Sequence, residues 1–330
     1  MELPTAALAD FGRRYPQPEC DYPDPMERAE FWDRLLGERA AVEDDSIPSA
    51  VLSEFDEGLF GGLLGGEVRF LAHRDVGWVS SMVPPLLTDW SELDGLHFDP
   101  SNLWWQRYQH QLEVFVERGR GKWGISHLIV VNGLNSIFEL VGATRTYLSL
   151  DEYPEKVRRA MDLAYHVNSV IQDKFFEVVP LLEGGTFSNF GQWIPGRIIS
   201  DSLDPFHMTS VAYFENWGRE PIERLLGDFD GGVIHIHGNG RHLLRAAATI
   251  KGLKAALLMD DRGFPAAFDV LTDLKSRMGD VPVAVLADYL TFVERLDRHG
   301  LPGGVMYQVK NVPDVATANR VMEKVRRYRV

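Results

Sequence analysis

The feature that most limits the fold is the regular alternation of short apolar runs and helical segments in the C-terminal third of the chain. From Gly232 onward a new apolar run starts after about every 22 to 27 residues, and the runs resemble strands buried on both faces. The predicted strands are 232–236, 254–259, 281–286 and 304–309, and the predicted helices after them are 241–250, 266–278, 289–298 and 315–328. This rhythm is typical of βα units around a parallel sheet.

The earlier part of the chain supplies further strands. Apolar runs predict strands at 47–52, 67–71, 78–83, 127–131 and 197–200, and helices at 102–118 and 154–179. Another helix is predicted to begin at Pro25, because Asp24 can cap its first turn. The prolines spread through residues 1–25 predict an extended arm there rather than a helix.

These elements predict an α/β fold, with a single (β/α)8 TIM-type barrel over residues 26–330. The barrel would have a helical N-terminal arm, preceded by the extended residues 1–25. An open doubly wound sheet is the alternative, but no Gly-x-Gly-x-x-Gly follows an early strand, which disfavours its dinucleotide-binding form. No Gly/Ser-rich linker divides the chain, so one domain is expected.

Charge and cysteine content exclude several classes of function. The chain has 330 residues and a formal net charge of −14, which disfavours broad binding to nucleic acid or to an anionic membrane. Its single cysteine, Cys20, excludes an intrachain disulfide and a zinc site made of several thiolates. The sequence shows no signal-peptide pattern and no apolar run of about 20 residues, so we expect a cytoplasmic protein.

Two histidines stand out at the end of the predicted strand 232–236. Residues two apart on a strand face the same side, so His235 and His237 could point at one ligand. Two imidazoles can begin a site for Zn²⁺ or another divalent ion, which needs a third ligand. The alternatives are metal-free proton transfer, in which His237 would be catalytic, and histidines that only bond to nearby backbone. Asn239 lies in the following glycine turn, which either contacts a ligand or is simply a tight loop.

Other site residues are expected where barrel strands end, because barrel active sites lie at the C-terminal face. Asp201 follows a strand directly and could move a proton or stabilise a positive charge, whereas Asp204 precedes a proline and is typical of a turn. Arginines and aromatic residues complete the candidates. Arg74, Arg197 and Arg262 could hold a substrate carboxylate or phosphate. Arg262 could instead pair with its neighbours Asp260 and Asp261. The aromatic candidates, which could contact substrate or belong to the core, are Trp78, Trp193, Phe190 and Tyr307.

Several stretches together resemble the uroporphyrinogen decarboxylase superfamily, whose fold is a single (β/α)8 barrel with N-terminal helices. Residues 26–38 and 45–48 are similar to its opening helix and Asp-x-Ile-Pro entry to the first strand. Residues 88–93 and 98–100 are similar to its approach to the next helix, and 230–240 to its late strand and glycine turn. Residues 251–255 and 304–319 fit its final units, so the resemblance covers about residues 25 to 330.

The resemblance implies one of two chemistries, and the sequence departs from both. The decarboxylases carry Arg-Gln-Ala-Gly-Arg-Tyr after the first strand, where this chain has Ser53-Glu54-Phe55-Asp56, and acids there would repel a polyanionic porphyrinogen. The corrinoid-linked methyltransferases bind zinc with His-x-Cys and a later Cys. Here His235 matches the histidine, His237 stands at the first cysteine position, and residues 305–310 contain no cysteine. A zinc ion would use His235, His237 and a further group such as a carboxylate.

We therefore expect an enzyme similar to the methyltransferase side of this superfamily. Its substrate would be a small methylated molecule or a methylated corrinoid, carried in some cases by a partner protein. One alternative is metal-free decarboxylation of a small carboxylate held by Arg74 or Arg262, with His237 moving the proton. The other is a barrel without catalysis that binds a corrinoid or a partner protein. Members of the superfamily often pair as homodimers, so a homodimer is also expected.

Overall fold

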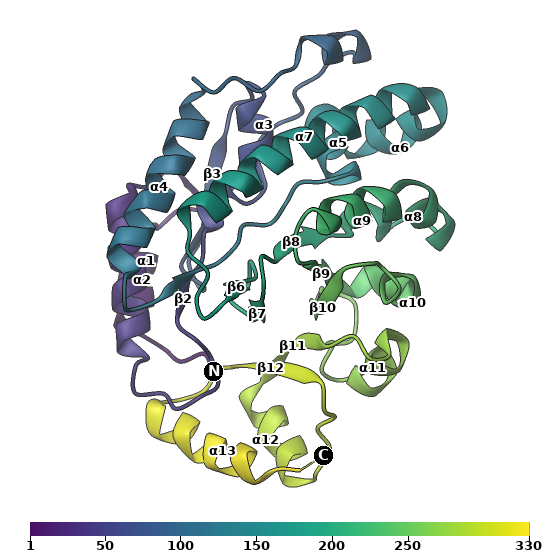
Figure 1. Cartoon of the computed structure of the whole chain (residues 1–330). Coiled ribbons are helices and arrows are strands. Elements are labelled where there is room, and N and C mark those ends of the chain that lie inside the picture. The colour runs from purple at the N-terminus through teal and green to yellow at the C-terminus, as the bar shows by residue number, and fades with distance from the viewer. Residues whose placement is uncertain (330) are drawn as a thin grey trace.

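The computed structural model describes residues 1–329 and is built on a five-stranded parallel sheet (Figure 1). The strand order is β12-β11-β10-β9-β8, with bounds β8 Ile199–Ser202, β9 Gly232–Ile236, β10 Leu253–Leu258, β11 Val283–Asp288 and β12 Val305–Lys310. Every neighbouring pair is parallel, and Ser202 pairs with His235. The five strands predicted in this region are confirmed, and the chain is a mixed α/β protein.

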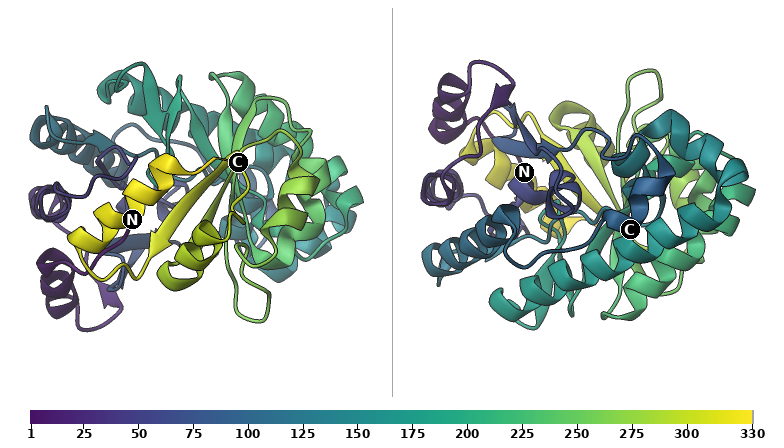
Figure 2. Two further views of the ribbon diagram at one scale, coloured as in Figure 1. Left: turned by 90° about the horizontal axis from the view of Figure 1, so that it is seen from below. Right: turned by 90° about the horizontal axis from the view of Figure 1, so that it is seen from above.

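A helical segment follows each strand of this sheet, as predicted for β9 to β12, and the segments after β8 had not been predicted. The segments are the 3-10 turn η3 (Asp204–Phe206) with α8 (Val211–Trp217) and α9 (Arg219–Gly227), η4 (Gly238–Leu243) with α10 (Leu244–Ala247), α11 (Leu271–Met278), α12 (Tyr289–Asp297) and α13 (Val315–Arg327). The two views of Figure 2 show these helices outside the curved array of strands. The βα connections therefore bring the loops after β8, β9 and β10 to one edge of the sheet.

Parallel pairing continues beyond β8. β2 (Ser49–Ala50) pairs parallel with β5 (Gly124–Ile125), and the segment after β5 forms parallel bridges at Ser126↔Phe187 and Ile129↔Ser200. On the other side, the Glu2 amide donates to the Val309 carbonyl at 2.7 Å. The α-amino group of Met1 pairs with Asp44, shortly before β2. The N-terminus therefore lies between β12 and the segment that leads into β2.

The predicted extended arm is wrong at residues 6–14, which form α1 (Ala6–Arg14). Pro4 and Pro16 lie outside this helix, so neither ring interrupts its hydrogen bonds. The Thr5 hydroxyl accepts from the Leu8 amide at 3.2 Å and caps the first turn. The prediction was wrong because the stretch between Pro4 and Pro16 contains no proline and is long enough for a helix.

The runs at 67–71 and 78–83 form strands, but these are not strands of the parallel array. β3 (Arg69–His73) and β4 (Trp78–Met82) make an antiparallel hairpin, and β1 (Glu19–Cys20) pairs antiparallel with β3. Only residues 74–77 separate the two strands, whereas a parallel crossover needs a dozen or more residues. The spacing alone therefore excludes two neighbouring barrel strands.

The remaining helices cover the N-terminal half. They are α2 (Pro25–Glu38), α3 (Gly58–Leu63), η1 (Ser53–Phe55), η2 (Trp90–Gly95), α4 (Leu103–Gly119), α5 (Leu134–Val141), α6 (Ala143–Glu152) and α7 (Pro154–Val178), and β6 (Gly185–Phe187) and β7 (Trp193–Pro195) form a hairpin after α7. The Asp24 cap of α2 is confirmed, because its carboxylate accepts from the Met26 amide at 2.8 Å.

No helix within residues 1–329 combines the length and apolar character needed to cross a bilayer.

A buried ion pair joins α2 to the segment after β2. Arg28 is 2% exposed and Glu54 is fully buried, and the guanidinium Nε donates to the Glu54 carboxylate. Gln111 donates to the other Glu54 oxygen at 2.8 Å. Glu54, expected as a charged group at the end of the first strand, is thus neutralised inside the core.

The buried His127 makes the stability of the fold depend on pH. Burial lowers the pKa of His127 to about 4, and its Nδ1 accepts from the Ser200 amide at 3.2 Å, so the folded ring is neutral. The unfolded chain binds a proton near pH 6.5, and stability is therefore lost as the pH falls from about 6.5 toward 4. We expect this group to remove about 2 kcal/mol between pH 6.5 and 5.

Urea unfolding of wild type and His127→Gln at pH 7 and pH 5 measures this contribution. The wild-type protein should lose more stability between the two pH values than the variant does, whatever the baseline stability of the variant. Equal losses in the two proteins would show that His127 does not carry the pH dependence.

Candidate metal centre

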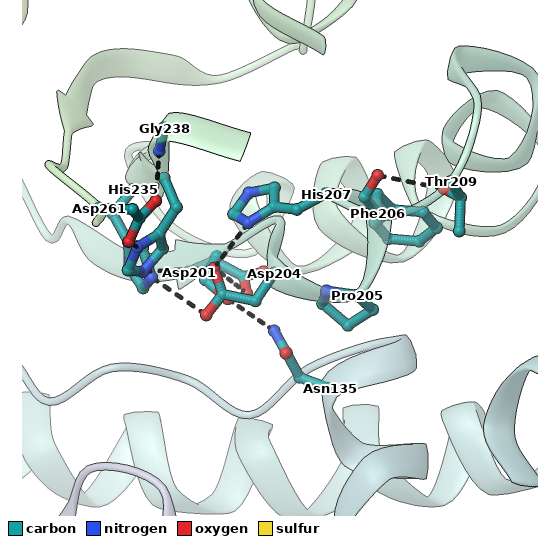
Figure 3. A network of polar contacts seen from close by, with 12 residues as sticks. Asn135, Asp201, Asp204, Pro205, Phe206, His207, Thr209, His235, Gly238 and Asp261 are labelled. Carbon is teal, nitrogen blue, oxygen red and sulfur yellow. Dashed lines mark hydrogen bonds and ion pairs between the residues drawn. The ribbon is translucent and has the colours of Figure 1, made fainter. Parts of the chain in front are cut away.

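Three ligand-type side chains meet at the edge of the sheet where β8 and β9 end. His235 lies near the end of β9, His237 follows β9 directly, and Asp204 opens the turn η3 after β8. His235 Nε2 is 3.2 Å from Asp204 Oδ2, and His237 Nε2 is 3.8 Å from Asp204 Oδ1. One ligand atom from each residue lies within 4.8 Å of the other two. Figure 3 shows Asp204 between His235 and His207.

The donor set fits a divalent transition-metal ion. Imidazole nitrogens and a carboxylate are ligands that Zn²⁺ takes in proteins, and three protein ligands leave a position for a substrate. Asp204 Oδ1 and His235 Nδ1 are buried and have no hydrogen-bond partner within the described chain. Buried polar atoms are normally satisfied, so each of these two atoms can still take a bonding partner.

The histidines around Asp204 keep its carboxylate ionised. Burial alone would raise the pKa of Asp204, but the hydrogen bond from His235 and the electrostatic effect of His235, His207 and His237 lower it to about 2. A metal ligand must be deprotonated, so this carboxylate is ready to bind a cation at neutral pH.

Asp261 fixes the orientation of His237. His237 Nδ1 lies 2.8 Å from Asp261 Oδ1, and the Gly238 amide donates to Asp261 Oδ2 at 2.6 Å. In this geometry the Nδ1–H donates to Asp261, which leaves the lone pair of Nε2 facing Asp204. A carboxylate behind a ligating imidazole commonly sets its tautomer in this way.

His207 packs behind Asp204. Its side chain is 3% exposed, and its Nδ1 is 3.5 Å from Asp204 Oδ1. Burial is the main reason that the pKa of His207 falls to about 4, so the ring is neutral. Gly240 provides the space for this ring, because a Cβ at Gly240 would lie 2.1 Å from His207 Cδ2.

This contact gives a prediction for Gly240→Ala. The added methyl group must displace His207 and with it the support of Asp204, so we expect Zn²⁺ affinity to fall about tenfold. Competition with a chromogenic chelator measures the change. Gly37→Ala is the matched control, because nothing lies within 4 Å of a Cβ there. If both variants bind zinc like wild type, His207 has no part in holding Asp204.

Three other predicted residues lie close to the centre. Asp201 is buried beside Asp204, where Asn132 and the Ser202 amide donate to its two oxygens at 3.1 and 2.8 Å. Burial raises the pKa of Asp201 to about 6. Asn239 is exposed on η4, and Arg262 is exposed in the loop that contains Asp261.

The remaining predicted substrate residues lie elsewhere. Arg74 occupies the β3–β4 turn, where its guanidinium faces Gly12 of α1. Trp193 stacks on Gly185, and its indole N–H donates to the Leu182 carbonyl at 2.9 Å. Tyr307 packs against Phe268 and Phe292, and its hydroxyl donates to Pro302 at 2.8 Å. Each side chain is thus occupied by a contact away from the histidines.

The structure adds residues that the sequence did not single out. His207 is one, and Glu57 is another. Desolvation of its carboxyl and the charge of Asp204 raise the pKa of Glu57, an exposed residue, whereas His235 and His237 lower it, so Glu57 lies within electrostatic reach of this centre. Of the aromatic candidates, Phe190 lies 6.3 Å from the His235 ring and Trp78 lies 5.4 Å from Phe190.

Comparison with known proteins gives a likeness at the level of fold. No family model matches the chain, and no curated protein matches it. Among solved structures, a methyltransferase from Methanosarcina mazei is similar, with a TM-score of 0.61 and 12% identity over 97% of this chain and 90% of that one. The two proteins share an overall fold, and the superfamily membership indicated by the sequence stays a prediction.

Proposed function

We propose that this chain is a metal-dependent methyltransferase related to the uroporphyrinogen decarboxylase superfamily. The observation that carries the proposal is the convergence of Asp204, His235 and His237 at the edge where β8 and β9 end. The methyltransferase of similar fold supports it, as does the place of His235 in the sequence resemblance. In this proposal the parallel strands belong to a TIM-type barrel, in which sites lie at this face.

In this proposal each residue of the metal centre has a defined chemical role. His235, His237 and Asp204 would hold Zn²⁺, which when bound acts as a Lewis acid and increases the acidity of a methyl acceptor. Asp261 keeps His237 Nε2 free to bind by accepting a hydrogen bond from the Nδ1–H group. Asp201, whose carboxyl has a pKa of about 6, lies close enough to exchange a proton with the site near neutral pH.

The donor is a small methylated compound or a methylated corrinoid, and the acceptor is a thiol or a reduced corrinoid. The centre lacks the thiolates of the zinc methyltransferases that the sequence resembles. Nitrogen and oxygen ligands donate less charge than thiolates, so a zinc ion here would be the stronger Lewis acid. We therefore expect acceptors with harder donor atoms to be tolerated as well.

Methyl-transfer assays test the proposal. Zinc-loaded protein is mixed with methylcobalamin or with small methylated N-, S- and O-compounds, together with thiol or reduced cobalamin as acceptor. The visible spectrum reports making or breaking of the cobalt–carbon bond. Wild type and the exposed control Asp162→Asn should react at least about tenfold faster than Asp204→Asn. A panel in which Asp204→Asn matches wild type with every donor contradicts the proposal.

A further inference from the structure

Two aromatic rings extend from the histidine pair. The Phe190 ring meets the His235 ring edge to face at 6.3 Å, and the Trp78 ring lies 5.4 Å from Phe190. Both aromatic side chains are half-buried, whereas His235 is 8% exposed and its Nδ1 has no partner in residues 1–329. Aromatic faces beside a polar centre attract cations, because the ring face carries partial negative charge.

The centre is rich in acidic side chains. Asp201, Asp204, Asp261 and Glu57 act on it, and a divalent ion would offset only two negative charges. Asp204, His235 and His237 act on Glu57, and Glu57 in turn raises the pKa of the buried acids Asp56 and Glu139. Within residues 1–329, the ion pairs of Asp204 and Asp261 are with histidines alone.

The nearby arginines do not reverse this balance. Arg241 donates to the Pro265 carbonyl at 2.6 Å and lies 3.7 Å from Asp260. Arg262 is exposed at the rim, next to Asp261. The buried Arg241 is thus held by Asp260 and Pro265, and an anionic substrate would meet the acids of the centre, which costs free energy.

From this combination we infer that the site binds a methylated cation, a quaternary ammonium or sulfonium compound, with its onium group against the half-buried Phe190 and Trp78 rings and within electrostatic reach of Glu57. The inference rests on the proposed methyl transfer and names the class of its small substrate. It departs from the carboxylate or phosphate that Arg74 and Arg262 were expected to hold.

Charge also favours turnover of such a substrate. When the methyl group passes to the nucleophilic acceptor, a thiolate or a reduced corrinoid, the electron pair of the broken C–N or C–S bond stays on nitrogen or sulfur. The product is then a neutral amine or thioether. It loses the attraction of Glu57 and of the aromatic rings, so it leaves more readily than the substrate.

Isosteric ligands that differ in charge test the inference by calorimetry on zinc-loaded protein. Choline, neutral 3,3-dimethylbutan-1-ol and anionic 3,3-dimethylbutanoate have nearly the same shape. Choline should bind at least about tenfold tighter than the alcohol, and the carboxylate should bind weakest. Glu57→Gln should remove most of this preference, and Phe190→Leu should weaken choline binding about fivefold.

Two matched controls should bind choline like wild type. Glu177→Gln changes an exposed acid paired with Lys174 on α7, and Phe98→Leu changes a half-buried aromatic residue packed on Trp105. If choline binds no tighter than the alcohol, or if the carboxylate binds tightest, the inference is wrong.

Zinc stoichiometry in the same samples separates this inference from the proposed function. If the protein binds one equivalent of zinc but shows no preference for choline, the inferred substrate class is wrong and the proposed metal centre is retained. Absence of zinc binding removes the proposed function. The ligand series is also repeated without zinc, where the preference for choline should grow because two positive charges are missing. An unchanged or smaller preference there contradicts the electrostatic basis of the inference.

Discussion

His237→Ala is expected to lower Zn²⁺ affinity by more than about a hundredfold. Loss of a residue that merely supports a ligand costs about 10- to 100-fold, and His237 is proposed as a ligand itself. Its Nε2 is 3.8 Å from Asp204 Oδ1 and its Nδ1 is held by Asp261, so the substitution removes a nitrogen that is already oriented toward the centre. Equilibrium dialysis of untagged protein against buffered zinc measures the affinity.

The matched control is His166→Ala, which removes an exposed histidine on α7. This variant should bind one equivalent of zinc as wild type does. Circular dichroism of both variants checks that the fold is retained, since His237 is partly exposed and its removal leaves little empty volume. Zinc binding by His237→Ala within threefold of wild type would exclude His237 as a ligand.

Arg28→Met is expected to reduce the free energy of unfolding by about 3–5 kcal/mol. The substitution leaves the Glu54 carboxylate buried without its charged partner. It also removes the hydrogen bond from the guanidinium to the Gly77 carbonyl, at 2.8 Å, and the stacking on Phe31, 4.8 Å from the ring centre. Denaturant unfolding at pH 7 measures the loss.

Two further variants identify the cause of this loss. Arg34→Met changes a half-exposed arginine of the same helix that pairs with Asp10 and Glu38, and it should cost less than about 1 kcal/mol. Arg28→Met combined with Glu54→Gln removes the stranded charge and should regain about half of the lost stability, because Gln111 can still donate to residue 54. If the double variant is as unstable as Arg28→Met, the unpaired charge is not the cause.

The C-terminal half of the fold could be predicted because its pattern is local and repeated. The strand at 232–236 has the predicted bounds, and β10, β11 and β12 differ from theirs by one or two residues. The sequence-based predictions are wrong where a tertiary contact or a short connection between two strands determines the structure. The Thr5 cap and the burial of Phe11 allow α1 to form among prolines, and the short turn after His73 makes β3 and β4 a hairpin.

The candidate site was predicted only in part, for physical reasons. His235 and His237 could be found because residues two apart on a strand share a face. Asp204 looked like a turn residue, and it does open a turn, but the β8–β9 register carries that turn to the histidines. One local feature of the sequence could have pointed to His207. It follows Asp204 by three residues, and side chains three residues apart on a 3-10 turn lie one above the other. Tyr307 packs on Phe268 and Phe292, because its position on the strand turns the side chain toward these aromatic residues.

Anomalous diffraction at the zinc absorption edge, from crystals of the protein grown with one equivalent of Zn²⁺, tests the metal centre most directly. We expect one strong anomalous peak about 2.0–2.2 Å from His235, His237 and Asp204, with a remaining position open to solvent or substrate. A peak at other residues, or full occupancy of zinc without contact to Asp204 and both histidines, would contradict it.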